Sequence, residues 1–455
     1  MIRRPPRSTP SNSSAASDVY KRQELMSLSK IYTQYWNPKL FAVSYFAVYW
    51  TDGAVRSLMI FLPLYLYTLQ VSPFDVAFIL IISYIAWHFK FLIGLLLDIS
   101  PAIGTWRRRP WIIAGRLMSI FSAIWLIFAR DVWLEILPAV LIIMTGEAIL
   151  DAAADALVLD IAPPDWHGFG LGSGWAGRAI GYVTSAILTS YVILNFGWQV
   201  AFLLYSIYSL PAFVVVLIKE PPITKETKFS KHALALTFSD KRIFALIVFA
   251  FIGCMIYGLD PNRGVLSQII YSYLRIEAKT PEEEIMLIIG YVGFIMAAFG
   301  IGVAIASLIL GRLSDKIGHK KAYIMSLIGG ILVILAWAIL PPETIGTLFN
   351  ILGNPKVSGL VFLSFILGLF EGWNFVMWEA ILADTVPPEM TAFMFQYFMS
   401  GVHASALIVG LVVGLMLDAG FSATIILTVI ALMCLIGGGS VLLVKPLKTS
   451  KVMRV

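Results

Sequence analysis

Twelve apolar runs, each long enough to cross a lipid bilayer, dominate this chain of 455 residues. A helix needs about 20 apolar residues to span the hydrocarbon core, which is roughly 30 Å thick. Only 13% of the residues are charged and 59% are hydrophobic, which leaves too little polar surface for a soluble protein of this length. The runs lie at residues 40–68, 74–97, 110–129, 133–159, 171–195, 197–218, 243–273, 285–312, 321–340, 357–383, 393–417 and 421–444. The sequence therefore predicts an all-α membrane protein with twelve transmembrane helices.

Polar segments divide these runs into two sets of six. We expect a six-helix bundle at residues 24–218, a cytoplasmic linker at 219–242, a second bundle at 243–445 and a tail at 446–455. Residues 1–23 are rich in Arg, Pro and Ser and are interpreted as non-native sequence or a disordered tail. They carry four of the six net positive charges, so the rest of the chain gives no indication of nucleic-acid binding.

Lys and Arg residues are distributed unevenly between the loops on the two sides of the predicted membrane. With the N-terminus placed inside, that side carries 19 of them and the other side carries 4. Short cytoplasmic loops of membrane proteins carry the excess of positive charge. We therefore expect a multi-pass protein of the cell membrane with both termini in the cytoplasm.

The two sets of helices repeat one another in sequence. DALVLDIAPPD at 155–165 recurs as EAILADTVPPE at 379–389, and GLLLD at 94–98 recurs as GRLSD at 311–315. Internal repeats of this kind are typical of secondary transporters, whose binding sites lie between the repeats. The pattern predicts two pseudo-symmetric six-helix bundles around a central cavity.

Ionisable residues at membrane depth are costly and are therefore candidates for function. The carboxylates that could carry a proton or cation are Asp52, Glu147, Asp151, Asp260 and Glu371. The guanidinium groups that could hold an anionic solute are Arg56, Arg178 and Arg263. The alternative is that such acids and bases only neutralise one another, as Asp52 and Arg56, four residues apart, could do.

These charges fall on particular segments. The third, sixth, ninth and twelfth segments are expected to carry none near mid-depth. Asp260 is followed by Pro261, which removes a backbone donor, so the seventh helix should be broken there. Lys90 is expected to extend its amino group toward the cytoplasm.

The stretch GRLSDKIGHKK at 311–321 resembles the loop signature of the major facilitator superfamily. Residues 71–98 followed by RRRPW at 107–111 are most similar to folate–biopterin transporters and muropeptide permeases, with sucrose and glycoside–cation symporters as the second choice. The resemblance implies that the first, fourth, seventh and tenth helices line the central cavity.

The resemblance also implies a charged gate at the cytoplasmic ends of the helices. In the first half, Asp98, Arg107, Arg108 and Arg109 would cluster with Asp155 and Asp160. In the second half, Asp315, Lys320 and Lys321 would cluster with Glu379 and Asp384. The alternative is that these charges only set the topology.

Together these features predict a secondary active transporter that moves a small polar or anionic organic solute by alternating access, with proton symport. A facilitative uniporter, a sugar–cation symporter and a non-transporting receptor or assembly factor stay open as alternatives. We expect no enzymatic activity, cofactor or metal site, and a functional monomer. Cys254 and Cys434 lie in apolar runs and are expected to pack.

Overall fold

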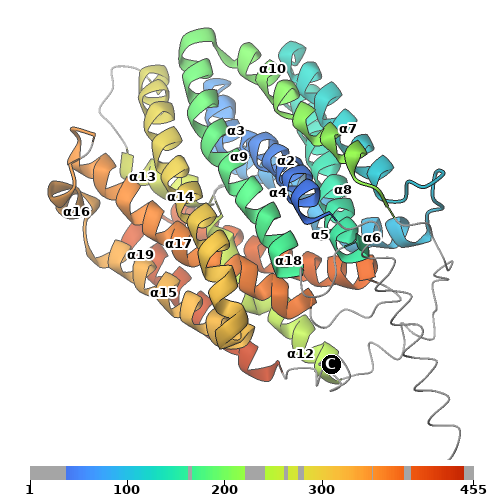
Figure 1. Cartoon of the computed structure of the whole chain (residues 1–455). Helices are drawn as coiled ribbons and strands as arrows, with labels where there is room; N and C mark the ends of the chain where they lie inside the picture. Colours follow the sequence, from blue (N-terminus) through green and yellow to red (C-terminus); the bar gives the residue numbers. More distant parts are fainter. Residues whose placement is uncertain are drawn as a thin grey trace, which may run out of the picture.

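A computed structural model describes residues 37–161, 167–220, 241–260, 265–274, 281–350, 352–383 and 391–444. Every regular element within these ranges is helical (Figure 1), as predicted. Two predicted site residues, Arg263 and Asp384, lie outside the described residues, and so does the side chain of Asp315. Both predicted terminal segments and most of the predicted linker also lie outside them.

The helices follow the twelve predicted segments. The N-half, residues 37–220, contains α2 (Pro38–Arg56), α3 (Leu58–Thr68), α4 (Pro73–Ser83), α5 (Ile85–His88), α6 (Lys90–Ile99), α7 (Arg109–Phe128), η1 (Val132–Ile136), α8 (Leu137–Ile161), α9 (His167–Phe196), α10 (Trp198–Tyr208) and η3 (Leu210–Leu217). The C-half, residues 241–444, contains α12 (Lys241–Val248), η4 (Phe249–Gly253), η5 (Met255–Leu259), α13 (Val265–Leu274), α14 (Pro281–Ile317), α15 (His319–Ile339), α16 (Pro342–Leu348), α17 (Pro355–Ala383), α18 (Thr391–Asp418), α19 (Ala423–Gly438) and η8 (Gly439–Leu443). Among the described residues, nine helices are long and apolar enough to cross a membrane.

The other three predicted segments are interrupted. The seventh breaks after η5, where Asp260 has extended backbone, which confirms the predicted break. The first and second segments also break, at Ser57 and at Tyr84 and Phe89, which was not predicted. Pro63, which has no N–H to donate, lies inside α3 without ending that helix.

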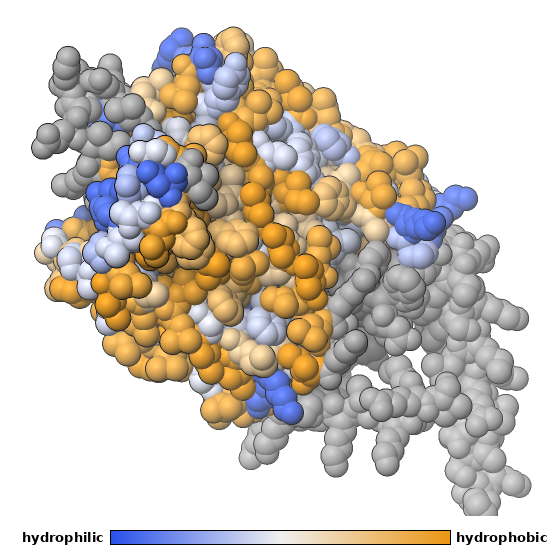
Figure 2. All heavy atoms as spheres, turned by 60° about the vertical axis from the view of Figure 1, so that its left-hand side comes forward, coloured by the Kyte–Doolittle hydropathy of each residue, from blue (hydrophilic) through white to orange (hydrophobic). Residues whose placement is uncertain are grey.

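The two halves lie side by side in Figure 1, with the blue-to-green helices on one side and the yellow-to-red helices on the other. They meet along α9 and α14 and, on another side, along α6 and α18. The outer surface carries many exposed large hydrophobic side chains, and the face in Figure 2 is largely hydrophobic. Such a surface suits hydrocarbon rather than water.

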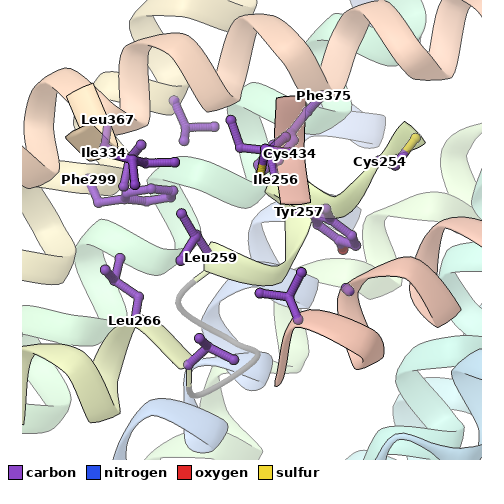
Figure 3. Close-up of a cluster of buried hydrophobic side chains, with 14 of the residues drawn as sticks. Cys254, Ile256, Tyr257, Leu259, Leu266, Phe299, Ile334, Leu367, Phe375 and Cys434 are labelled. Carbon is purple, nitrogen blue, oxygen red and sulfur yellow. The ribbon is translucent and has the colours of Figure 1, made fainter. Parts of the chain in front are cut away.

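Buried apolar side chains fill the interior of the C-half. Tyr257, Phe299 and Phe375 are among the residues packed there (Figure 3). Cys254 and Cys434 are free thiols in the same core, in keeping with the packing role expected of them.

Glycines on α9 allow α2 to approach it closely. A Cβ atom placed on Gly177 would lie 2.4 Å from the carbonyl oxygen of Phe46, and one on Gly181 would lie 2.2 Å from that of Trp50. Real side chains do not tolerate such distances, so only glycine fits. This contact fixes α2, and with it the charged residues near its end.

Replacing Gly177 by Ala should therefore destabilise the protein by roughly 1–3 kcal/mol, the usual cost of overpacking. Thermal unfolding in detergent would measure the loss. Gly172→Ala is the matched control on the same helix, because its added Cβ would lie 3.8 Å from the nearest neighbouring atom. A Gly177→Ala protein as stable as this control would contradict the close-contact explanation.

Candidate functional site

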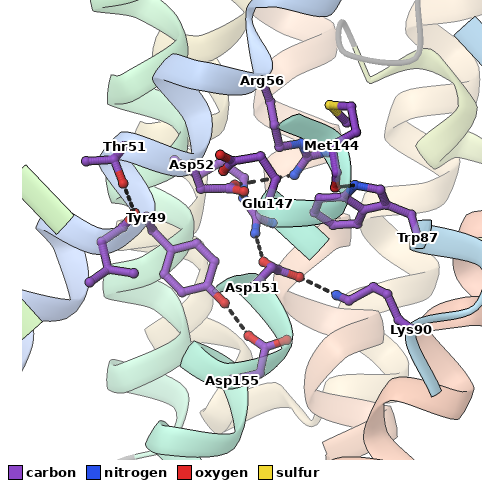
Figure 4. A network of polar contacts seen from close by, with 12 residues as sticks. Tyr49, Thr51, Asp52, Arg56, Trp87, Lys90, Met144, Glu147, Asp151 and Asp155 are labelled. Carbon is purple, nitrogen blue, oxygen red and sulfur yellow. Dashed lines mark hydrogen bonds and ion pairs between the residues drawn. The ribbon is translucent and has the colours of Figure 1, made fainter. Parts of the chain in front are cut away.

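A network of buried charges occupies the middle of the N-half (Figure 4). It contains four acids and four bases, and no side chain among them is more than 4% exposed. The members are Asp52, Arg56, Lys90, Arg116, Glu147, Asp151, Asp155 and Arg178. The charges balance, so their burial is tolerated where isolated charges would not be.

Arg178 joins the first and fourth predicted segments. Its Nε lies 2.6 Å from Asp52 Oδ2, and its Nη2 donates to Asp151 Oδ1. Arg56 also contacts Asp52, at 3.3 Å, as their spacing allowed. Lys90 is buried and donates to Asp151, so the expectation that its amino group extends toward the cytoplasm is wrong. Its amino group finds a carboxylate inside the protein instead of water outside it.

Glu147 forms a pair that the sequence did not indicate. Arg116 on α7 donates to it, with Nη2 2.8 Å from Oε2, and Ser119 Oγ adds a bond of 2.7 Å. The prediction that the third segment carries no charge near mid-depth is therefore wrong. Gly115 and Gly146 make the pair possible, because a Cβ on Gly115 would lie 2.4 Å from the Gly146 carbonyl oxygen.

Breaking this pair from one side should cost about 3–5 kcal/mol, because the remaining charge stays buried without a partner. Glu147→Gln and Arg116→Gln are each expected to lower the unfolding temperature in detergent. The double variant should lose less stability than the two single losses added together. Additive losses would show that the two groups do not stabilise each other.

Aromatic rings link the two halves in an arc. Trp87 lies 5.0 Å from His403, and His403 lies 5.7 Å from Tyr257, between ring centroids. Tyr257 continues to Trp378 at 5.9 Å, and Trp378 to Trp175 at 6.3 Å. We call these five residues the aromatic arc. Its two ends belong to the N-half and its middle to the C-half.

Arginines cap both ends of the arc. The guanidinium of Arg56 lies 4.3 Å over the ring of Trp87, and that of Arg178 lies 4.5 Å over Trp175. Asp52 contacts both arginines, which closes the arc into a ring. Within the described residues, Nε and Nη2 of Arg56 have no hydrogen-bond partner. Arg56 thus keeps unused donors, whereas Arg178 uses its Nε and Nη2 on two carboxylates.

The acids of the C-half are placed differently. Glu371 on α17 is fully buried, and in the described part of the chain neither of its carboxyl oxygens has a hydrogen-bond partner. The neighbouring helix α15 has no charged residue between Ala322 and Ile339 that could act as Arg116 does. Asp260 is also buried, next to the break in the seventh segment.

Charges at one end of the N-half form the cluster that the resemblance implied, with changes. Arg108 Nε lies 2.7 Å from Asp160 and its Nη2 lies 3.1 Å from Asp98, and Arg107 contacts the same two acids. Arg109 instead pairs with Glu220 at 2.9 Å, an acid at the start of the predicted linker that the sequence did not single out. We call this end of the molecule the basic end.

Asp155 and Glu379, both expected in the charged clusters, bond across the two halves instead. Asp155 Oδ2 accepts from Gln396 Nε2 on α18 at 3.0 Å, and Glu379 Oε2 accepts from Trp175 Nε1 on α9. We call these two bonds the cross-half contacts.

The remaining charges at the basic end also differ from expectation. Asp98 Oδ2 accepts from the backbone N–H of Phe393 at 3.0 Å, which adds a further bond between the halves. Among the described contacts, Lys320 donates to the carbonyl oxygens of Leu442 and Val444, and Lys321 is exposed. Two acids expected in this cluster, Asp315 and Asp384, have side chains outside the described residues, so the cluster around Lys320 stays a prediction.

A cavity of about 70 Å³ lies between the halves nearer the opposite end. It is lined by Tyr84 and His88 from the second predicted segment and by Val265, Gly410 and Gly414 from the C-half. Tyr84 also lies 6.3 Å from Trp87, between ring centroids, so the cavity adjoins the aromatic arc. The described residues contain no cluster of His, Cys, Asp or Glu able to hold a metal ion.

Comparison with known proteins gives a family match over most of the chain. Residues 41–281 and 276–452 match the model of the Major Facilitator Superfamily. A probable folate-biopterin transporter 4 of Arabidopsis thaliana is 26% identical over 169 residues, which is 35% of this chain but only 33% of that relative. A multi-drug resistance efflux pump PmrA homolog of Lactococcus lactis is 24% identical over 73% of this chain and 82% of its own.

Proposed function

This chain belongs to the major facilitator superfamily, and on that premise we propose that it moves a small polar or anionic organic solute by alternating access, coupled to proton symport. The family match makes it a membrane transporter rather than an enzyme. The solute, the coupling proton and the direction of transport are the proposed parts. The basic end would face the cytoplasm, since positive residues are retained there.

The observation that carries proton coupling is that Glu371 is buried and neither of its carboxyl oxygens has a hydrogen-bond partner among the described residues. A buried carboxylate without a partner costs far more than a neutral carboxylic acid in the same place. Glu371 would therefore hold a proton in this closed arrangement and release it when water reaches α17. Asp52, Glu147 and Asp151 are paired with cations, which makes them weaker candidates for the proton site.

The arrangement of the two ends supports alternating access. Several side-chain and backbone bonds join the halves at the basic end, whereas the other end holds the cavity beside Tyr84 as well as the bond from Ser190 to Ile289. A transporter that closes one side of its site while solute reaches it from the other side needs this asymmetry.

The aromatic arc and Arg56 support a flat, anionic solute. Aromatic faces stack on planar rings, and the unused donors of Arg56 suit a carboxylate. The name of the Arabidopsis relative agrees with this chemistry, so folates and pterins are the first solutes to test. Muropeptides and disaccharides complete the panel, because the sequence also resembles transporters of those classes.

Glu371→Gln should abolish uptake driven by a pH gradient while leaving exchange of bound solute intact. Gln cannot release a proton, but it keeps the shape of the side chain. Purified protein in liposomes, assayed with labelled folate with and without a pH gradient, would measure both rates. Glu343→Gln, an exposed acid on α16, is the control and should behave as the unaltered protein. Unchanged pH-driven uptake by Glu371→Gln would remove Glu371 as the proton site.

Arg56→Lys should weaken solute binding by roughly ten-fold or more, because an ammonium cannot hold a carboxylate through two parallel bonds. The apparent KM for folate uptake would rise more than the maximal rate falls. A change in maximal rate alone would argue against Arg56 as the anchor.

The same measurements separate the alternatives. Uptake without proton movement would indicate a uniporter, and outward transport of a multidrug substrate would favour the activity named for the Lactococcus relative. Binding without flux would indicate a receptor.

A further inference from the structure

Arg178 lies between two aromatic rings of the N-half. Its guanidinium carbon is 4.7 Å from the ring centroid of Tyr49 and 4.5 Å from that of Trp175. On the side of the central network, the same guanidinium bonds Asp52 and Asp151. Four side chains therefore determine its position, and it determines where the two rings lie.

Each of these rings carries a polar atom that leads on to a cross-half contact. The hydroxyl of Tyr49 donates to Asp155 Oδ1, while Asp155 Oδ2 accepts from Gln396 of the C-half. The indole N–H of Trp175 donates directly to Glu379 of the C-half. All these side chains are buried, so water does not compete for the bonds.

The two cross-half contacts are related by the sequence repeat. Asp155 and Glu379 are the first acids of the repeated cassettes, and they lie on α8 and α17, the equivalent helices of the two halves. One contact joins α8 to α18 and the other joins α9 to α17. The guanidinium of Arg178 touches a ring next to each contact. Arg178 lies on α9, which takes part in the second contact but not in the first.

We propose that Arg178 is a positioning residue that couples the central charge network to both cross-half contacts through Tyr49 and Trp175. A solute that changes the charge around Asp52 alters the position of the guanidinium. Both rings then move, and the two cross-half contacts are weakened together. This inference rests on the proposed transport function, but the coupling can be measured without transport.

The test uses the full chain in detergent micelles, with Cys254 and Cys434 replaced by Ala and one reporter cysteine added. Ser400→Cys reports on the basic end, because Ser400 on α18 is buried and its Oγ lies 3.3 Å from the Phe91 amide of the N-half. Ser190→Cys reports on the opposite end, where Ser190 bonds the carbonyl of Ile289 at 2.7 Å. The rate of modification by a maleimide measures how often each end opens.

Tyr49→Phe keeps the ring and removes the O–H, whereas Trp175→Phe replaces the indole by a smaller aromatic ring without the N–H. Each should raise the Ser400→Cys rate by roughly ten-fold, the effect of losing a hydrogen bond to a charged group, without raising the Ser190→Cys rate. Arg178→Lys leaves both rings unaltered but cannot stack on them and bond two carboxylates together, so it should give the same change. When Arg178→Lys and Trp175→Phe are combined, the fold-increase in the Ser400→Cys modification rate should be smaller than the product of the two single fold-increases.

Trp337→Phe is the matched control. Trp337 on α15 is a buried tryptophan whose Nε1 has no hydrogen-bond partner among the described residues. If Trp175→Phe changes the reporter rates no more than Trp337→Phe does, or if both reporters rise together, the rings only fill space and the proposal is overturned. No solute or pH gradient enters this test, so its result is independent of the Glu371→Gln assay.

Discussion

The cost of burying charge in a low-dielectric interior organises this molecule. In the N-half the four central acids are balanced by four bases drawn from α2, α6, α7 and α9, and the helices can approach because glycines line their contacts. The C-half has the same arrangement of helices but not the same bases, so Glu371 is buried without hydrogen bonds among the described residues. The two halves therefore resemble each other in the arrangement of their helices but differ in their buried charged side chains.

The fold could be predicted from the sequence because lipid leaves the backbone few choices. Twelve apolar segments, their repeat and the break at Asp260 all follow from local patterns. The breaks at Tyr84 and Phe89 could not be predicted, because neither residue is a helix breaker. They occur where the second segment bends past Trp87 and Lys90, both held by contacts to α8. Tertiary contacts, not local preference, set those breaks.

Helical spacing predicted the pair within one helix, and the family resemblance predicted the contacts of Arg108 with Asp98 and Asp160, but the pair of Arg116 with Glu147 was missed. Asp52 and Arg56 are four residues apart, and their contact follows from helical spacing. Arg116 and Glu147 meet only because α7 and α8 pack through Gly115 and Gly146, which the sequence does not show. The roles of Gln396 and Trp175 were missed because both are uncharged, so a census of ionisable residues passes over them.

The neutrality of Gln396 and Trp175 affects how the two halves can part. When an ion pair opens, two charges must each gain a hydration shell, and dissolved ions screen their attraction. In each of these contacts only the carboxylate is charged and must gain the hydration shell of an ion. The amide of Gln396 and the indole of Trp175 are neutral. Separation of the halves at these two points should thus depend weakly on ionic strength. The rate at which the halves open and close there would then stay steady in cells whose internal salt content fluctuates.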